Sequence, residues 1–207
     1  MYKSAMEIDP FHANSIYNYG VLCDSGLRNQ TLAESLYRRC LLVSGGKHSF
    51  ALYNLAVMLE EVRGGTKEGK AEVNDLFKKA AEAAPRDSVT IADYGRFLMV
   101  KCNEIDKAEC LLRRSVELNP DCVVGNYNLG VLLFSHREDH AGAETLFNHV
   151  LRIETSHIES MRCLARISQK RGGIERAEKW LKKALKLAEG AAKAEVKSDI
   201  EKLRKKS

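Results

Sequence analysis

Apolar residues recur at helical spacing along most of the chain, in segments separated by short polar stretches. The segment 123–135 places Tyr127 and Leu133 at helical spacing, and the segment 141–153 does the same with Leu146 and Phe147. No apolar run approaches the roughly 20 residues that a membrane-spanning helix needs. The pattern predicts an all-α protein built from pairs of short amphipathic helices.

A small residue returns at a nearly constant interval in the first helix of each pair. The positions are Gly20, Ala56, Gly95, Gly130 and Ala165, at intervals of 36, 39, 35 and 35 residues. The second helices align on Ala33, Val73, Ala108, Ala143 and Ala177, and each carries a large apolar residue four positions later. A small residue on one helix admits a bulky side chain from its antiparallel neighbour. A period of this length predicts stacked helical hairpins.

The residues around these small positions resemble the tetratricopeptide repeat family. They are YNYG at 17–20, YNLA at 53–56, DYG at 93–95 and YNLG at 127–130, together with second helices such as AECLLRRSVELNP at 108–120. The resemblance covers about residues 13–189. It implies five repeats in a right-handed superhelical α-solenoid, whose concave groove is lined by the first helices.

The repeat boundaries follow from the same alignment. We expect repeats at 13–48, 49–87, 88–122, 123–157 and 158–190, followed by an amphipathic capping helix at 191–207. Residues 1–12 match the second helix of a truncated repeat, and apolar surface around Tyr2 and Ala5 then predicts self-association. In the second repeat, the segment 61–70 predicts a lengthened inter-helix loop, which resembles the related Sel1-like repeats.

Charge is distributed unevenly. The formal net charge is +5, but residues 158–207 contribute +8 and the remainder −3. A uniformly basic nucleic-acid binder would not show this asymmetry. The repeat interval and the basic C-terminal segment nevertheless leave an RNA-binding helical repeat as an alternative function.

The sequence offers little for catalysis or metal binding. We find no nucleophile constellation, phosphate-binding loop or dinucleotide fingerprint, and we expect neither a cofactor nor a catalytic residue. His136 and His140 fall in a predicted connection without a further ligand set, so we expect no metal site. The six cysteines contain no CxxC pair, which favours reduced thiols and an intracellular, cytoplasmic location. The chain could still be the substrate-recruiting or regulatory arm of a larger enzyme.

The resemblance implies that the residue two before each small position points into the groove. These residues are Asn18, Asn54, Asp93, Asn128 and Cys163, and a tyrosine precedes each of the asparagines, at Tyr17, Tyr53 and Tyr127. An amide side chain both donates and accepts hydrogen bonds, so a column of asparagines could pair with the backbone of an extended peptide.

Guanidinium groups enter the predicted groove towards the C-terminal half of the chain. Arg96 and Arg166 each follow a small position, and Arg162 lies one helical turn before Arg166. We therefore predict a non-catalytic protein-interaction scaffold that binds an extended or helical partner segment. That segment would carry acidic or phosphorylated residues at one end.

Overall fold

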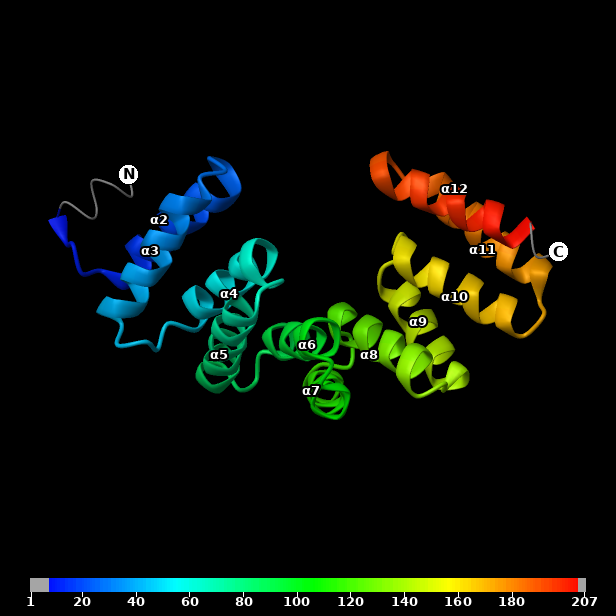
Figure 1. Cartoon of the computed structure of the whole chain (residues 1–207), viewed down its shortest axis with the longest axis horizontal. Coiled ribbons are helices and arrows are strands. Elements are labelled where there is room, and N and C mark those ends of the chain that lie inside the picture. Colours follow the sequence, from blue (N-terminus) through cyan, green and yellow to red (C-terminus); the bar gives the residue numbers. More distant parts are fainter. Residues whose placement is uncertain (1–7, 205–207) are drawn as a thin grey trace. The chain divides into compact units, whose positions relative to one another are not determined.

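The described part of the structure consists of helices joined by short connections. The computed structural model describes residues 8–204, and within that range no β-strand occurs (Figure 1). The chain divides into two units, Met1–Glu104 and Ile105–Ser207, and each is described separately below. The predicted all-α fold is confirmed.

Unit 1 contains two helical hairpins and a further first helix. The elements are α2 (Ala13–Val21) with the π-helical turn η1 (Leu22–Gly26), α3 (Gln30–Val43), α4 (Ser49–Arg63), α5 (Lys67–Ala83), and α6 (Ser88–Phe97) with the π-helical turn η2 (Leu98–Cys102). Helix α2 packs on α3 and α4 on α5, while α3 also contacts α4 and α5 contacts α6. The hairpins therefore stack in chain order.

Unit 2 continues the pattern and ends on a single helix. Its elements are α7 (Ile105–Leu118), α8 (Val123–His136), α9 (His140–Ile153), α10 (Ile158–Lys170), α11 (Ile174–Leu187) and α12 (Gly190–Arg204). Helix α12 packs on α11 and buries Val196 and Leu203. The predicted third repeat contributes α6 to unit 1 and α7 to unit 2.

Close helix contact within a hairpin depends on the small residues. A Cβ atom at Gly20 would lie 2.8 Å from Cε1 of Tyr37, and one at Gly130 would lie 2.8 Å from Cε1 of Phe147. Both aromatic side chains are fully buried and stand four residues after the small position of the second helix. Interiors are packed too densely to absorb an added atom at such a distance without movement. The predicted pairing of small and bulky residues is thus present in the structure.

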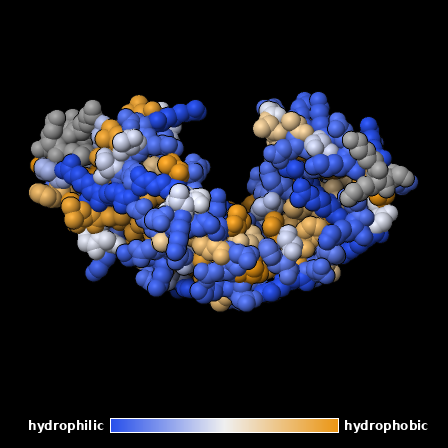
Figure 2. All heavy atoms as spheres, in the orientation of Figure 1, coloured by the Kyte–Doolittle hydropathy of each residue, from blue (hydrophilic) through white to orange (hydrophobic). Residues whose placement is uncertain are grey.

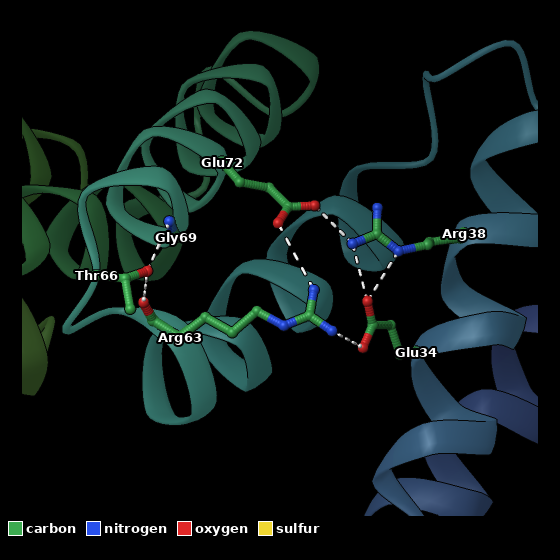
Figure 3. A network of polar contacts seen from close by, with 6 residues as sticks. All are labelled: Glu34, Arg38, Arg63, Thr66, Gly69 and Glu72. Carbon is green, nitrogen blue, oxygen red and sulfur yellow. Dashed lines mark hydrogen bonds and ion pairs between the residues drawn. The ribbon is translucent and has the colours of Figure 1, made fainter.

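The second hairpin differs from the sequence prediction. The long loop expected over 61–70 is wrong, because α4 runs to Arg63 and α5 begins at Lys67. Thr66 is the N-cap of α5, and its hydroxyl oxygen accepts a hydrogen bond from the backbone N–H of Gly69 at 3.0 Å (Figure 3). A Cβ at Gly69 would lie 2.0 Å from the carbonyl oxygen of Arg63. The glycine allows the tight turn, so the additional residues lengthen the helices.

The first helices begin at side chains that accept a hydrogen bond from the helix backbone. Nδ1 of His48 accepts from the backbone N–H of Ala51, and Nδ1 of His157 accepts from that of Ser160. The same N-cap position is held by His12, Asp87 and Cys122 in the other first helices. Such caps satisfy backbone donors that have no partner within the helix.

The expectations for the N-terminal end fall mostly beyond the structure. The truncated repeat assigned to residues 1–12, and the self-association surface around Tyr2 and Ala5, lie largely or wholly outside the described residues.

Candidate partner-binding surface

In unit 1, tyrosines and polar side chains connect neighbouring first helices. The amide nitrogen of Asn54 on α4 donates to the hydroxyl of Tyr17 on α2 at 3.2 Å. The hydroxyl of Tyr53 donates to Oδ2 of Asp93 on α6 at 2.7 Å. Predicted site residues therefore also hold adjacent repeats together. Burial raises the pKa of Tyr17 and of Tyr53, for Tyr53 with a further contribution from Asp93, so both hydroxyls remain donors at neutral pH.

Asn18 differs from the other asparagines because its side chain is exposed. Within residues 8–204, no hydrogen bond is recorded for its amide. Asn54 is half-buried, and Asn128 is only 5% exposed. The amide nitrogen of Asn128 donates to the backbone carbonyl of Val124 at 3.0 Å, one turn earlier in α8. The three asparagines are therefore not equivalent, and Asn18 is the one most accessible to a ligand.

Tyr17, which precedes Asn18 in the chain, belongs to an aromatic cluster. The ring of Tyr17 is 4.8 Å from that of His48 and 6.1 Å from that of Phe50, measured between centroids. Phe50 belongs to the first turn of α4 and is 60% exposed. The face drawn in Figure 2 is mostly hydrophilic. Phe50 is one of several exposed large apolar residues, and its ring contacts those of Tyr17 and His48. Phe50 was not predicted from the sequence as a site residue, because it lies outside the repeated groove positions.

In unit 2, the corresponding tyrosine contacts the cap of the next first helix. The ring of Tyr127 lies 5.0 Å from that of His157, much as Tyr17 lies against His48. Cys163 occupies the position equivalent to the asparagines and is 8% exposed. Burial raises the pKa of its thiol to about 11, so the group is a neutral thiol at physiological pH. The recurrence of a tyrosine–histidine contact in both units was not foreseen from the sequence.

Arg96 is bound to carboxylates of unit 1. Its two terminal nitrogens donate to the two carboxylate oxygens of Glu60 on α4, at 2.9 and 2.5 Å. Its Nε donates to Asp93 at 3.4 Å. The side chain of Glu60 is 7% exposed and that of Arg96 is 30% exposed. The ion pairs with Glu60 and Asp93 raise the pKa of Arg96 despite the opposing effect of burial.

Arg162 and Arg166 face the capping helix. Arg162 donates from Nε to Asp199 at 2.7 Å and pairs with Glu195, both on α12. Arg166 approaches Asp199 only to 3.9 Å, and 54% of its side chain is exposed. Arg162 stands at the position that Tyr17, Tyr53 and Tyr127 hold in other repeats. Of the three predicted arginines, Arg166 is therefore the one whose guanidinium remains most open.

A second set of ion pairs connects second helices to the following first helices. In Figure 3, Glu34 on α3 accepts from Arg63 at the end of α4 at 3.0 Å, and Arg38 bridges Glu34 and Glu72. The equivalent pairs in unit 2 are Glu109 with Arg137 and Glu144 with Arg171. Each of these glutamates directly follows the small residue of its second helix. That Ala-Glu signal was available in the sequence, but its arginine partner was not apparent.

The described part of the chain contains neither a cluster of metal-binding side chains nor a membrane-spanning helix. Among residues 8–204, no group of three or more histidine, cysteine or acidic side chains is placed to hold a metal ion. His140 is the first residue of α9, and its ring packs 5.3 Å from that of Phe134. All six cysteines are free thiols. No helix in the described range is both long and apolar enough to cross a membrane.

Solved structures of tetratricopeptide repeat proteins share this fold. YrrB, described as such a protein with an unusual peptide-binding site, is 22% identical with a TM-score of 0.66, over 95% of this chain and 97% of that one. PilF of Pseudomonas aeruginosa is 17% identical with a TM-score of 0.77, over 96% and 86% of the two chains. A thermophilic protein of this type from Thermus thermophilus, TTC0263, is 17% identical with a TM-score of 0.70, over 91% and 98%.

No family model matches the sequence. No curated protein matches it either. At these identities the likeness establishes the fold, a tetratricopeptide-type stack of helical hairpins.

Proposed function

We propose that this chain is a non-catalytic protein-interaction scaffold that binds an extended or helical segment of a partner on its first helices. The observation that carries the proposal is the surface formed by Asn18, Tyr17, His48 and Phe50 in unit 1. It combines an exposed amide with an exposed aromatic ring on a support fixed by hydrogen bonds. We call these four residues the α2–α4 surface.

The two parts of the α2–α4 surface suit different parts of a peptide. The Asn18 amide can donate to a backbone carbonyl and accept from a backbone N–H of the partner. The Phe50 ring offers apolar area to one side chain of the partner. Asn54 supports this surface by donating to Tyr17. We therefore assign direct contact to Asn18 and Phe50, and positioning to Asn54.

The proposed contact with acidic residues of the partner lies in unit 2. Arg96 and Arg162 are already occupied by carboxylates of the chain itself, whereas Arg166 is largely exposed. We propose that a partner segment with acidic residues contacts unit 2 at Arg166. Competition from Asp199, 3.9 Å away, keeps this contact weak.

A photo-crosslinking residue at position 18 tests the proposal directly. Placed there, it should capture a defined set of partner peptides from cell extract, identifiable by mass spectrometry. The matched control carries the same residue at position 42, because Leu42 is 82% exposed but lies on the second helix α3. Identical peptides from both positions, or none from position 18, would refute the assignment of the α2–α4 surface.

A further variant, Phe50→Ala, completes the experiment. It should lose the peptides captured from position 18, since the ring is exposed and its removal leaves little unfilled space. Circular dichroism checks that the helices persist. If cross-linked RNA rather than peptide were recovered from position 18, the RNA-binding alternative would replace the present proposal.

A further inference from the structure

Helix α11, the second helix of the last hairpin, differs in residue type from the other second helices at two adjacent positions. Where earlier repeats carry Leu36, Leu76, Leu111 and Leu146, α11 carries Trp180, the only tryptophan of the chain. The residue before it is Lys179, and the equivalent positions hold Ser35, Asp75, Cys110 and Thr145. Leu36 and Leu76 are buried, at 5% and 8% exposure, whereas Leu111, Leu146 and Trp180 are half-buried. At this partly exposed position, α11 therefore offers a larger apolar ring than the other second helices do.

The structure shows a hollow at this place. Arg176, Lys179, Trp180 and Lys183, all on α11, line a shallow depression of about 320 Å³ with largely apolar walls. The ammonium group of Lys183 lies 5.6 Å from the centroid of the Trp180 ring. An apolar hollow with cationic groups around its rim fits an apolar side chain with negative charge on either side of it.

The lysines on the rim are available to a ligand. In the described range, no carboxylate forms an ion pair with Lys179 or Lys183. By contrast, Arg176 is paired with Glu144 at 2.7 Å, and Lys182 is paired with Glu178 at 3.0 Å. The cluster therefore keeps two uncompensated positive charges beside the indole. Two such charges and one aromatic pocket define a small site for an acidic segment.

Glu144 and Glu178 also argue against a nucleic acid at this place. A nucleic acid strand presents a continuous row of phosphates and needs a basic track along its length. Here Glu144 and Glu178 pair with Arg176 and Lys182, so the basic groups do not form a continuous track. A short segment with one apolar anchor and a few flanking carboxylates needs only the two unpaired lysines.

We propose that this α11 site binds an acidic peptide segment of a partner protein, with one leucine or aromatic side chain seated against Trp180 and flanking glutamates or aspartates at Lys179 and Lys183. The site is independent of the α2–α4 surface, which consists of unit 1 residues only. It gives the scaffold a second binding point for a segment of different composition.

The indole provides its own readout, because no other tryptophan contributes to the fluorescence of the protein. We would titrate the whole chain with a short synthetic peptide in which one leucine is flanked on both sides by glutamates. A saturable change in tryptophan emission is expected, with an affinity weakened at least about tenfold by raising the salt concentration from low to molar. A peptide with lysines in place of the glutamates should leave the emission unchanged.

The variant K179E/K183E should abolish the emission change, while its circular dichroism spectrum stays that of the wild type. The matched control is K67E/K78E on α5, which makes the same charge change in exposed residues of unit 1. The proposal is overturned if the acidic peptide leaves the emission unchanged, or if K179E/K183E binds it as well as the control does. It is also overturned if a single-stranded RNA or an anionic lipid vesicle gives a saturable change and the peptide does not.

Discussion

Glu60 on α4 and Arg96 on α6 form a bidentate ion pair across the interface between these two helices. The residues are 36 positions apart in sequence, and both carboxylate oxygens are bonded, at 2.9 and 2.5 Å. The glutamate is nearly excluded from solvent. The arginine that the sequence assigned to a partner is therefore part of the scaffold, and its removal should affect stability first.

Breaking this pair should destabilise the protein more than removing it entirely. E60M leaves Arg96 partly buried with Asp93 alone, and R96M leaves the buried Glu60 carboxylate without a cation. Each should lower the free energy of unfolding by about 2–4 kcal/mol. The double variant E60M/R96M should lose less than either single variant, as measured by urea denaturation in a double-mutant cycle. Strictly additive losses would contradict the pairing.

The ion pairs in Figure 3 should matter much less, because their arginines are 44% and 45% exposed. We expect Glu34→Ala to lower the free energy of unfolding by about 0.5–1 kcal/mol at low ionic strength, and by less in high salt. The same denaturation series, run at two salt concentrations, checks this. An effect that is equally large in high salt would show that Glu34 contributes by packing rather than by charge.

Stability should depend on pH through the His48 cap. Nδ1 of His48 accepts from the backbone N–H of Ala51, and its Nε2 is 3.0 Å from Oδ1 of Asn14. Among the groups described around it are the rings of Tyr17 and Phe50, and no carboxylate within residues 8–204 pairs with it. Burial lowers its pKa below 6.5, so the folded state favours the neutral ring that can accept at Nδ1.

A lowered pKa in the folded state fixes the sign of the effect. Above about pH 6.5 the contribution of His48 is complete, and it is lost as the pH falls through 6.5 towards the folded-state pKa. His48→Asn keeps a capping acceptor but cannot titrate, so its stability curve should be flatter over this range. Thermal unfolding measured from about pH 7.5 to about pH 5 tests the comparison. Identical slopes for the two proteins would rule out a role for His48 in the pH dependence.

Gly130 should not tolerate even a methyl group. An added Cβ would lie 2.8 Å from Cε1 of the buried Phe147, a ring with little room to move. Gly130→Ala should therefore lower the free energy of unfolding by about 1–3 kcal/mol despite its gain in helix propensity. Gly65→Ala is the control, since nothing lies within 4 Å of a Cβ at that position. Equal stability of the two variants would show that the hairpin can adjust at low cost.

The cysteines should differ widely in reactivity. Burial raises the pKa of Cys40 and of Cys163 to about 11, whereas Cys110 is exposed. Because the thiolate is the nucleophile, iodoacetamide at about pH 8 should modify Cys110 first and the two buried thiols last. Peptide mapping at successive times measures the order. Rapid labelling of Cys163 in the folded protein would mean that α10 opens readily.

Much of the fold could be predicted from the sequence because a hairpin is specified locally. The spacing from Gly130 to the aligned Ala143 and Phe147 lies within one repeat, and helix periodicity assigns each residue to a face. The exception is the segment 61–70, which was predicted to form a lengthened loop. Thr66 and Gly69 instead permit a turn that is short enough for both helices to extend.

The sequence by itself determined the all-α hairpin repeat, the small-to-bulky contacts and the positions of Asn18, Asn54 and Asn128 on their helices. Only the tertiary structure decided which of these side chains remain open to a partner. Tyr53 reaches Asp93 over 40 residues, Asn54 reaches Tyr17 over 37, and Arg162 reaches Asp199 over 37. These pairs join a repeat to the next repeat or to the capping helix, and they depend on how far each element is offset and rotated against its neighbour. Periodicity along the chain carries no information on that offset, so it could not distinguish a binding residue from one that holds the repeats together.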